Sequence, residues 1–165
     1  MRGMKKVKDF MTKRVIYLKP NDTVFKAAKI FCEKRISGAP VVKDAKSKKL
    51  VGVISESDIV KFMGINMFNT KNFAGDFTYQ SLTLLFLNLI STGKNFINAK
   101  REVERISKVK VANVMSKKVI SVSPETSLFD AASKMDMYDI NRLPVVKDGK
   151  LVGIIARADL LKALI

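Results

Sequence analysis

The sequence predicts an α/β protein made of two tandem β-α-β-β-α repeats with a helical insertion between them. Three observations support this prediction: an internal repeat, a matching order of strand and helix patterns in each copy, and a globular composition. Hydrophobic residues make up 47% and charged residues 28% of the 165 residues. A disordered chain of this charge would contain far fewer apolar side chains.

The repeat is visible when the chain is compared with itself. Residues 9–44 (DFMTKRVIYLKPNDTVFKAAKIFCEKRISGAPVVKD) align without a gap with residues 113–148 (NVMSKKVISVSPETSLFDAASKMDMYDINRLPVVKD). A short gap in the next turn then aligns the KLVG of 49–52 with the KLVG of 150–153. Self-similarity of this extent indicates a duplicated structural unit.

The first half of each copy predicts a strand followed by a helix. Residues 15–18 are β-branched and apolar, and the strand ends before Pro20, which has no N–H for a ladder. Asp22 and Thr23 offer capping oxygens to a helix. Apolar residues at helical spacing over 24–31 predict one buried face.

The second half of each copy predicts a hairpin that leads into another helix. Val41 and Val42 begin one strand, and a turn over 44–49 leads to the next strand at 50–54. The sequence SESD at 55–58 then opens a helix. The same order recurs over 119–164, so both repeats predict the same fold.

These boundaries divide the chain into three parts: a first repeat at 1–62, an insertion at 63–108 and a second repeat at 109–165. Within the insertion, the pattern predicts helices at 78–90 and 95–108. The first of these is apolar on nearly all sides, which predicts burial against its own domain or against a second subunit.

Composition excludes several function classes. The chain has no His and one Cys (Cys32), which argues against zinc sites, disulfides and His-dependent catalysis. We expect Cys32 to lie in the core. No secretory signal and no apolar run long enough to span a bilayer is visible, so we expect a cytoplasmic protein that does not associate with a membrane. The net charge of +16 would attract a polyanion, or simply keep the surface soluble.

Three pairs of segments resemble the CBS motif, and two such motifs in tandem resemble a CBS pair, or Bateman module. The pairs are VIYLKP and VISVSP, ISGAPVV and INRLPVV, and GVISESD and GIIARAD. The resemblance implies a regulatory module rather than an enzyme, with no catalytic residue, metal or cofactor. Its implied ligand contains adenosine: AMP, ADP, ATP, S-adenosylmethionine or methylthioadenosine.

The strand–helix junction can be interpreted chemically in two ways. A helix N-terminus with a Ser hydroxyl can bind phosphate, and a carboxylate three residues later can accept bonds from ribose hydroxyls. Alternatively, Ser55 and Asp58 form a capping box, in which each side chain satisfies the other residue's N–H. In the second repeat Ala156 has no hydroxyl, yet Asp159 is still present.

The resemblance further implies two pseudo-symmetric clefts, each taking its Asp from one repeat and its base-binding wall from the other. One would combine Ser55, Ser57 and Asp58 with Ile120, Ser121, Asn141, Arg142, Leu143 and Pro144. The other would combine Arg157 and Asp159 with Ile16, Tyr17, Ser37, Gly38, Ala39 and Pro40. Because only the first keeps the hydroxyl, we expect it to prefer a phosphorylated ligand.

The leading hypothesis is therefore a homodimeric sensor that binds an adenosine ligand and regulates a protein partner. The alternative is a basic nucleic-acid-binding or structural dimerisation module whose clefts are vestigial.

Overall fold

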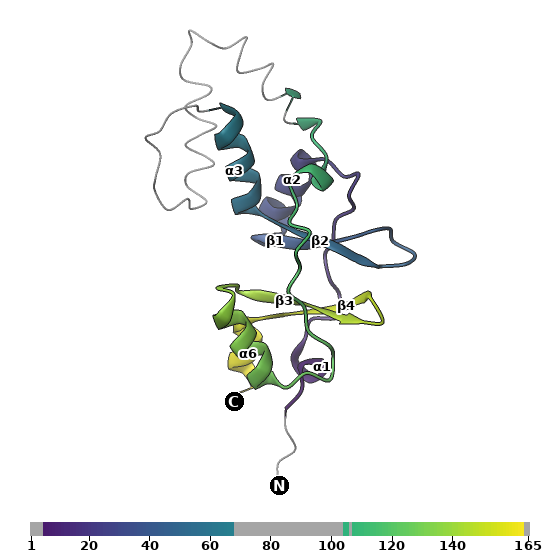
Figure 1. Ribbon diagram of the computed structural model, residues 1–165, viewed down its shortest axis with the longest axis vertical. Coiled ribbons are helices and arrows are strands. Elements are labelled where there is room, and N and C mark those ends of the chain that lie inside the picture. Colours follow the sequence, from purple (N-terminus) through teal and green to yellow (C-terminus); the bar gives the residue numbers. More distant parts are fainter. Residues whose placement is uncertain (1–4, 68–103, 106, 164–165) are drawn as a thin grey trace. The chain divides into compact units, whose positions relative to one another are not determined.

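The computed structural model describes residues 5–67, 104–105 and 107–163, and the side chains of 63–67 are outside this description. Most of the predicted insertion, with its helix at 78–90, therefore lies outside the described residues. The elements are α1 (Val7–Phe10), α2 (Val24–Lys34), β1 (Gly38–Val42), β2 (Leu50–Ser55), α3 (Glu56–Met67), η1 (Val111–Asn113), α6 (Leu128–Met137), β3 (Arg142–Lys147), β4 (Lys150–Ala156) and α7 (Arg157–Lys162) (Figure 1). Among the described residues, no helix has the length and apolarity needed to cross a membrane.

The first helix of each repeat begins where the sequence predicts. The Thr23 hydroxyl accepts a hydrogen bond from the Lys26 N–H at 3.1 Å, and α2 follows. In the second repeat the Ser127 hydroxyl accepts from the Asp130 N–H at 3.0 Å, and α6 follows. Cys32 does not lie in the core as expected: it is exposed, because it follows Phe31 by one position and so leaves the buried face of α2.

The two predicted hairpins are confirmed. One two-stranded sheet pairs β1 with β2, and the other pairs β3 with β4 in antiparallel register from Arg142 opposite Ala156 to Lys147 opposite Lys150. Between these last two residues, Asp148 and Gly149 both have positive φ (50° and 74°), as a tight two-residue hairpin turn requires.

The strand predicted at the start of each repeat is much shorter than expected. In the second repeat it consists of one parallel bridge, between Val122 and Val145. The Val122 N–H donates to Pro144 O at 3.1 Å, and Val122 O accepts from the Val146 N–H at 2.8 Å. Pro124 lies two residues beyond and has no N–H, so the ladder does not extend in that direction.

The described residues divide into two compact units. One contains those of 1–17, 40–53 and 117–165, and the other contains those of 18–39 and 54–116. The core of the first unit joins residues of α6, both strands, the N-terminal segment and the bridge residue Val122: Val7, Val122, Ala131, Met135, Leu143, Val145 and Ile155. Leu160 of α7 is partly buried against this core. In the second unit, the following buried residues occupy positions that correspond to this core: Leu18, Ala27, Phe31, Ala39, Ile54 and Val111. Val24, Ile59 and Val60 are buried there as well.

In each unit, a segment that precedes the other repeat in the chain contacts the first helix. Next to α6, the Val7 N–H donates to Thr126 O at 2.9 Å and the Leu128 N–H donates to Lys5 O at 3.1 Å. Next to α2, the Val111 N–H donates to Asp22 O and the Val24 N–H to Val109 O, both at 2.8 Å.

These equivalent bonds occupy the backbone groups at the start of each helix. They also bury Val7 and Val111 completely (0% exposed). Each segment is therefore an integral part of the unit in which it is buried.

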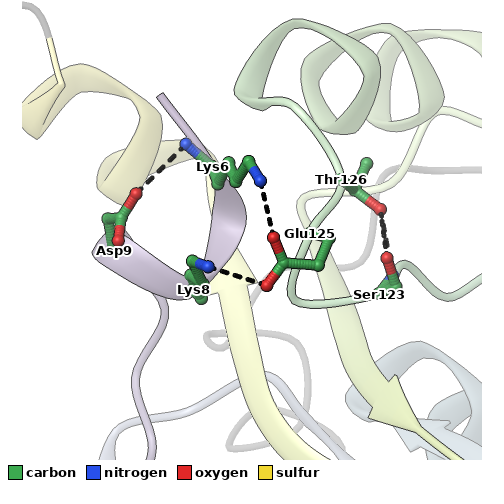
Figure 2. Close-up of polar contacts among 6 residues, drawn as sticks. All are labelled: Lys6, Lys8, Asp9, Ser123, Glu125 and Thr126. Carbon is green, nitrogen blue, oxygen red and sulfur yellow. Dashed lines mark hydrogen bonds and ion pairs between the residues drawn. The ribbon is translucent and has the colours of Figure 1, made fainter. Parts of the chain in front are cut away.

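Two lysines of the N-terminal segment form ion pairs with one acid beside the start of α6, Glu125. Lys6 Nζ lies 2.6 Å and Lys8 Nζ 2.8 Å from the two carboxylate oxygens of Glu125, as Figure 2 shows. Hydrogen bonds from Lys6 and then Lys8 lower the pKa of Glu125 to about 2. The same carboxylate raises the pKa of Lys8.

This depressed pKa predicts an acid-sensitive contact. Because protonation in the folded state occurs near pH 2 and in the unfolded chain near the ordinary value of 4.5, the stabilisation is present above pH 4.5. It is lost as the pH falls from there through 2. We expect the urea midpoint of the wild type to be higher than that of Glu125→Gln at pH 7. The difference between the two midpoints should vanish near pH 2.

The control is the same substitution in a Lys6→Gln, Lys8→Gln background. There Glu125→Gln should change the urea midpoint equally at both pH values. A pH-dependent difference that persists without the two lysines would contradict the assignment.

Candidate functional site

The first candidate site is the junction where β2 passes directly into α3. The Ser55 N–H and the Ser55 hydroxyl both donate to Asp58 Oδ2, at 2.8 and 2.7 Å. The Asp58 N–H donates back to Ser55 Oγ at 3.2 Å. The capping-box interpretation of this segment is therefore directly observed.

The box leaves part of Asp58 available. Every hydrogen bond that Asp58 accepts from another described residue ends on Oδ2, so Oδ1 has no partner among them. In contrast, the Ser55 hydroxyl donates its single hydrogen to Asp58. The junction thus offers a fixed carboxylate acceptor, whereas the hydroxyl donor expected for a phosphate is already in use.

The second candidate site, where β4 passes into α7, has the same backbone design with different side chains. Asp159 is 7% exposed, and its Oδ2 accepts from the Ala156 N–H at 3.0 Å. Its Oδ1 lies 2.7 Å from Nζ of Lys162. Both oxygens of Asp159 are therefore engaged within its own unit.

The segment before each repeat's hairpin is tied to the same junction. The Glu56 N–H donates to Ser37 O, and the Arg157 N–H donates to Asn141 O, each at 3.0 Å. These equivalent bonds fix the first helical residue of α3 and of α7 beside the residue that precedes β1 and β3, respectively.

The two junctions differ in charge at one equivalent position, which is Glu56 in the first repeat and Arg157 in the second. Glu56 Oε1 is buried without a hydrogen-bond partner among the described residues. Arg157 is half exposed and lies 4.0 Å from the exposed Asp139. An exposed ion pair at this distance contributes little to the stability of the protein. The α3 junction is consequently rich in acceptors.

Close backbone approach explains Gly38. A Cβ at this position would lie 2.9 Å from Ile54 O and 3.2 Å from the Ser55 Cα. Both atoms belong to the backbone of β2, which cannot move without disturbing the junction. The absent side chain therefore lets β1 lie against the end of β2.

The structure brings together some of the predicted site residues within each unit. Ser37, Gly38, Ser55 and Asp58 meet at the α3 junction. At the α7 junction, the Asn141 carbonyl accepts from the Arg157 N–H, and Arg142 lies opposite Ala156, whose N–H donates to Asp159. Leu143 and Pro144 lie opposite Ile155 and Ile154, further along β4 from the junction. The predicted site residues also differ in burial. Those that are buried are Leu143, Ala39 and Pro40, and Ile120 packs against the core. The half-buried residues are Tyr17 and Ser121, and the exposed ones are Ile16, Ser37 and Ser57.

The grouping of residues from both repeats in one cleft stays a prediction. Sequence reasoning missed two residues: the acceptor Glu56 and the ion-pair partner Lys162. Lys162 had a visible signal, because it follows Asp159 by three positions on a predicted helix. Glu56 had none, since a lone Glu in the first turn of a helix is an ordinary dipole partner.

Among the described residues, no cluster of three or more His, Cys, Asp or Glu side chains is placed to hold a metal ion. The arrangement offers a carboxylate oxygen without a partner among the described residues at the α3 junction, which suits a ligand that carries hydroxyl donors.

Comparison with known proteins identifies the class. The CBS domain model matches residues 7–65 and 111–165, so the chain belongs to the CBS-domain family with two copies of the domain. It is 38% identical over 160 residues to the protein MJ1426 of Methanocaldococcus jannaschii, covering 96% of this chain and 90% of that one.

Other relatives carry further information. The chain is 32% identical to CBSX2, a chloroplastic CBS domain-containing protein of Arabidopsis thaliana, and spans 95% of its own length but 62% of CBSX2. The crystal structure of CBSX2 in complex with AMP matches with a TM-score of 0.65 at 28% identity, covering 97% of this chain and 96% of that one. The CBS domain of a membrane protein from Sphaerobacter thermophilus matches with a TM-score of 0.70 at 30% identity over 98% and 89%.

The Gly38 contact yields a prediction. Gly38→Ala should destabilise the protein by about 1–3 kcal/mol, because the added methyl group overlaps a backbone oxygen that cannot withdraw. Chemical denaturation measures this change. The neighbouring exposed Ser37→Ala should change stability by less than about 0.5 kcal/mol, and an equal loss in both variants would contradict the packing explanation.

Proposed function

We propose that this protein is a ligand-sensing regulatory module that binds an adenosine-containing ligand at its strand–helix junctions. Family membership supports the regulatory role, and the AMP complex of the related CBSX2 supports the ligand class. Within this chain the proposal rests on one observation: Asp58 is fixed by a cap through Oδ2, while its Oδ1 has no partner among the described residues.

The chemistry of the ribose fits this acceptor. Two neighbouring hydroxyl groups can donate to one carboxylate, and hydrogen bonds to a charged group are stronger than those between neutral groups. The cap holds the carboxylate in place before the ligand arrives, so little ordering is required on binding. A ligand bound there regulates only if it binds one conformational state of the protein more tightly than another.

The charge of the α3 junction changes the expected ligand preference. Ser55 does not offer its hydrogen to a phosphate, and Glu56 adds a second acid to the same turn. We therefore propose that this junction binds adenosine ligands with an uncharged or cationic 5′ group better than AMP, the reverse of the expectation from sequence. Methylthioadenosine and S-adenosylmethionine have such groups.

A homodimer and a regulated protein partner also stay predictions. The apolar segment at 82–90 that motivates the homodimer lies outside the described residues. The described part exposes several large apolar side chains, among them Phe25 and Phe129 at equivalent positions of the two repeats.

The first test replaces the acid and keeps its cap. Asp58→Asn retains an oxygen for the Ser55 N–H but removes the charge that ribose hydroxyls would meet. We expect the affinity for methylthioadenosine and AMP, measured by calorimetric titration, to fall at least about tenfold. Asp159→Asn should have a smaller effect, since Lys162 already occupies Oδ1 of Asp159.

A matched control exists on α6. Asp130 makes the same local pattern with Ser127, whose hydroxyl donates to Asp130 Oδ2 at 2.7 Å, but it lies at no strand–helix junction. Asp130→Asn should leave ligand affinity unchanged. An equal loss in Asp58→Asn and Asp130→Asn, or no adenosine ligand bound below about millimolar by wild type, would refute the proposed function.

The second test changes the charge beside the ribose acceptor. Glu56→Gln should raise the affinity for AMP severalfold, because it removes a negative charge next to the phosphate. The affinity for uncharged methylthioadenosine should stay nearly unchanged. The exposed Glu33→Gln, which makes the same change in net charge on α2, should affect neither ligand. If AMP affinity does not rise in Glu56→Gln, the charge assignment is wrong.

A further inference from the structure

The turns of the two hairpins pair with each other within the first unit. Lys49 and Lys150 form an antiparallel bridge. The Leu50 N–H donates to Gly149 O at 3.2 Å, and the Leu151 N–H donates to Lys48 O at 2.9 Å. These two bonds flank the bridge, so Lys49 and Lys150 are a directly opposed pair without mutual hydrogen bonds. In such a pair the side chains lie close together on one face.

This pairing concentrates positive charge from both repeats. We call the following exposed residues the lysine patch: Lys43, Lys46, Lys48, Lys49, Lys147 and Lys150. None of them forms an ion pair with another described residue. Like charges directly opposite each other destabilise a strand pair, so an anion that neutralises the patch gains binding energy there.

The one acid within the first turn is already engaged. Asp44 Oδ1 accepts from the N–H groups of Lys46 and Ser47, at 2.9 and 2.6 Å, and Oδ2 accepts from the Ser47 hydroxyl at 2.7 Å. These hydrogen bonds from Ser47 lower the pKa of Asp44 and keep it charged, but they direct both its oxygens into the turn. Asp148 supplies the second acid, so the patch keeps a clear excess of positive charge.

We propose that the lysine patch is a binding surface for the phosphate backbone of a nucleic acid. Lysine ammonium groups with free donors suit phosphates whose spacing varies along a flexible chain. A protein partner fits less well, because protein interfaces are depleted of Lys at their core and depend on apolar or aromatic anchors. The exposed large apolar side chains of the described residues are Ile16, Phe25, Phe129, Met137, Tyr138 and Leu161, none of which lies in either turn.

The test uses a fluorescently labelled single-stranded DNA oligonucleotide of mixed sequence and anisotropy at several salt concentrations. The triple variant Lys46→Gln, Lys49→Gln, Lys150→Gln should bind at least about tenfold more weakly than wild type at 50 mM salt. The slope of log affinity against log salt should become shallower by about 2, since each phosphate contact to a single strand contributes about 0.7.

A second triple variant controls for total charge. Lys13, Lys34 and Lys117 are exposed, lie outside the patch and form no ion pair with a described residue. Replacing all three by Gln should weaken binding by no more than about twofold, because long-range charge is screened. Equal losses in the two triple variants would overturn the proposal, because they would show that net charge alone attracts the DNA.

Two further results would also overturn it. One is the absence of DNA binding by wild type at 50 mM salt. The other is displacement of the labelled DNA by polyglutamate at the same concentration of negative charge at which unlabelled DNA displaces it, because the patch would then not distinguish a nucleic acid from an acidic protein surface. The Asp58→Asn variant should bind DNA as wild type does, so this proposal and that of an adenosine site succeed or fail separately.

Discussion

The structure depends on the contact between each repeat's first helix and the segment that precedes the other repeat. Equivalent backbone hydrogen bonds join residues 5–8 to 124–128 and residues 109–112 to 20–24. The buried valine in each segment, Val7 or Val111, completes a small core. A repeat of this size has only a marginal core, so the apolar surface that the added segment buries contributes to its stability. The Glu125 ion pairs strengthen one of these contacts and make it sensitive to acid.

The two junctions show how a duplicated framework can carry different chemistry. The bonds from Glu56 to Ser37 and from Arg157 to Asn141 have the same length and position, so the backbone is preserved in both repeats. The side chains are not: the first junction has a hydroxyl and two acids in its first turn, whereas the second has Arg157 and an Asp159 held by Lys162. Selectivity can therefore differ between the repeats while the fold stays the same, because the backbone bonds do not depend on these side chains.

The lysine patch and the junctions are separate features of the same hairpins. The junctions use the end of each second strand, and the patch uses the turns at the opposite end. The net charge of +16 is compatible with a plain soluble surface, but pairing of the two turns places lysines of both repeats next to one another. Local density, rather than total charge, distinguishes a binding surface from a solvated one.

The sequence by itself determined the duplication, the cap at Thr23, both hairpins and the capping box at Ser55 and Asp58. All of these depend on residues close together in the chain, where spacing and residue type set the geometry. Only the tertiary structure decided that the predicted first strand of the second repeat pairs at a single bridge, and that Glu56 Oε1 is buried without a hydrogen-bond partner among the described residues. It also decided which segment completes each core and that Lys49 faces Lys150. These features arise from contacts between residues distant in the chain, which periodicity and local propensity do not encode.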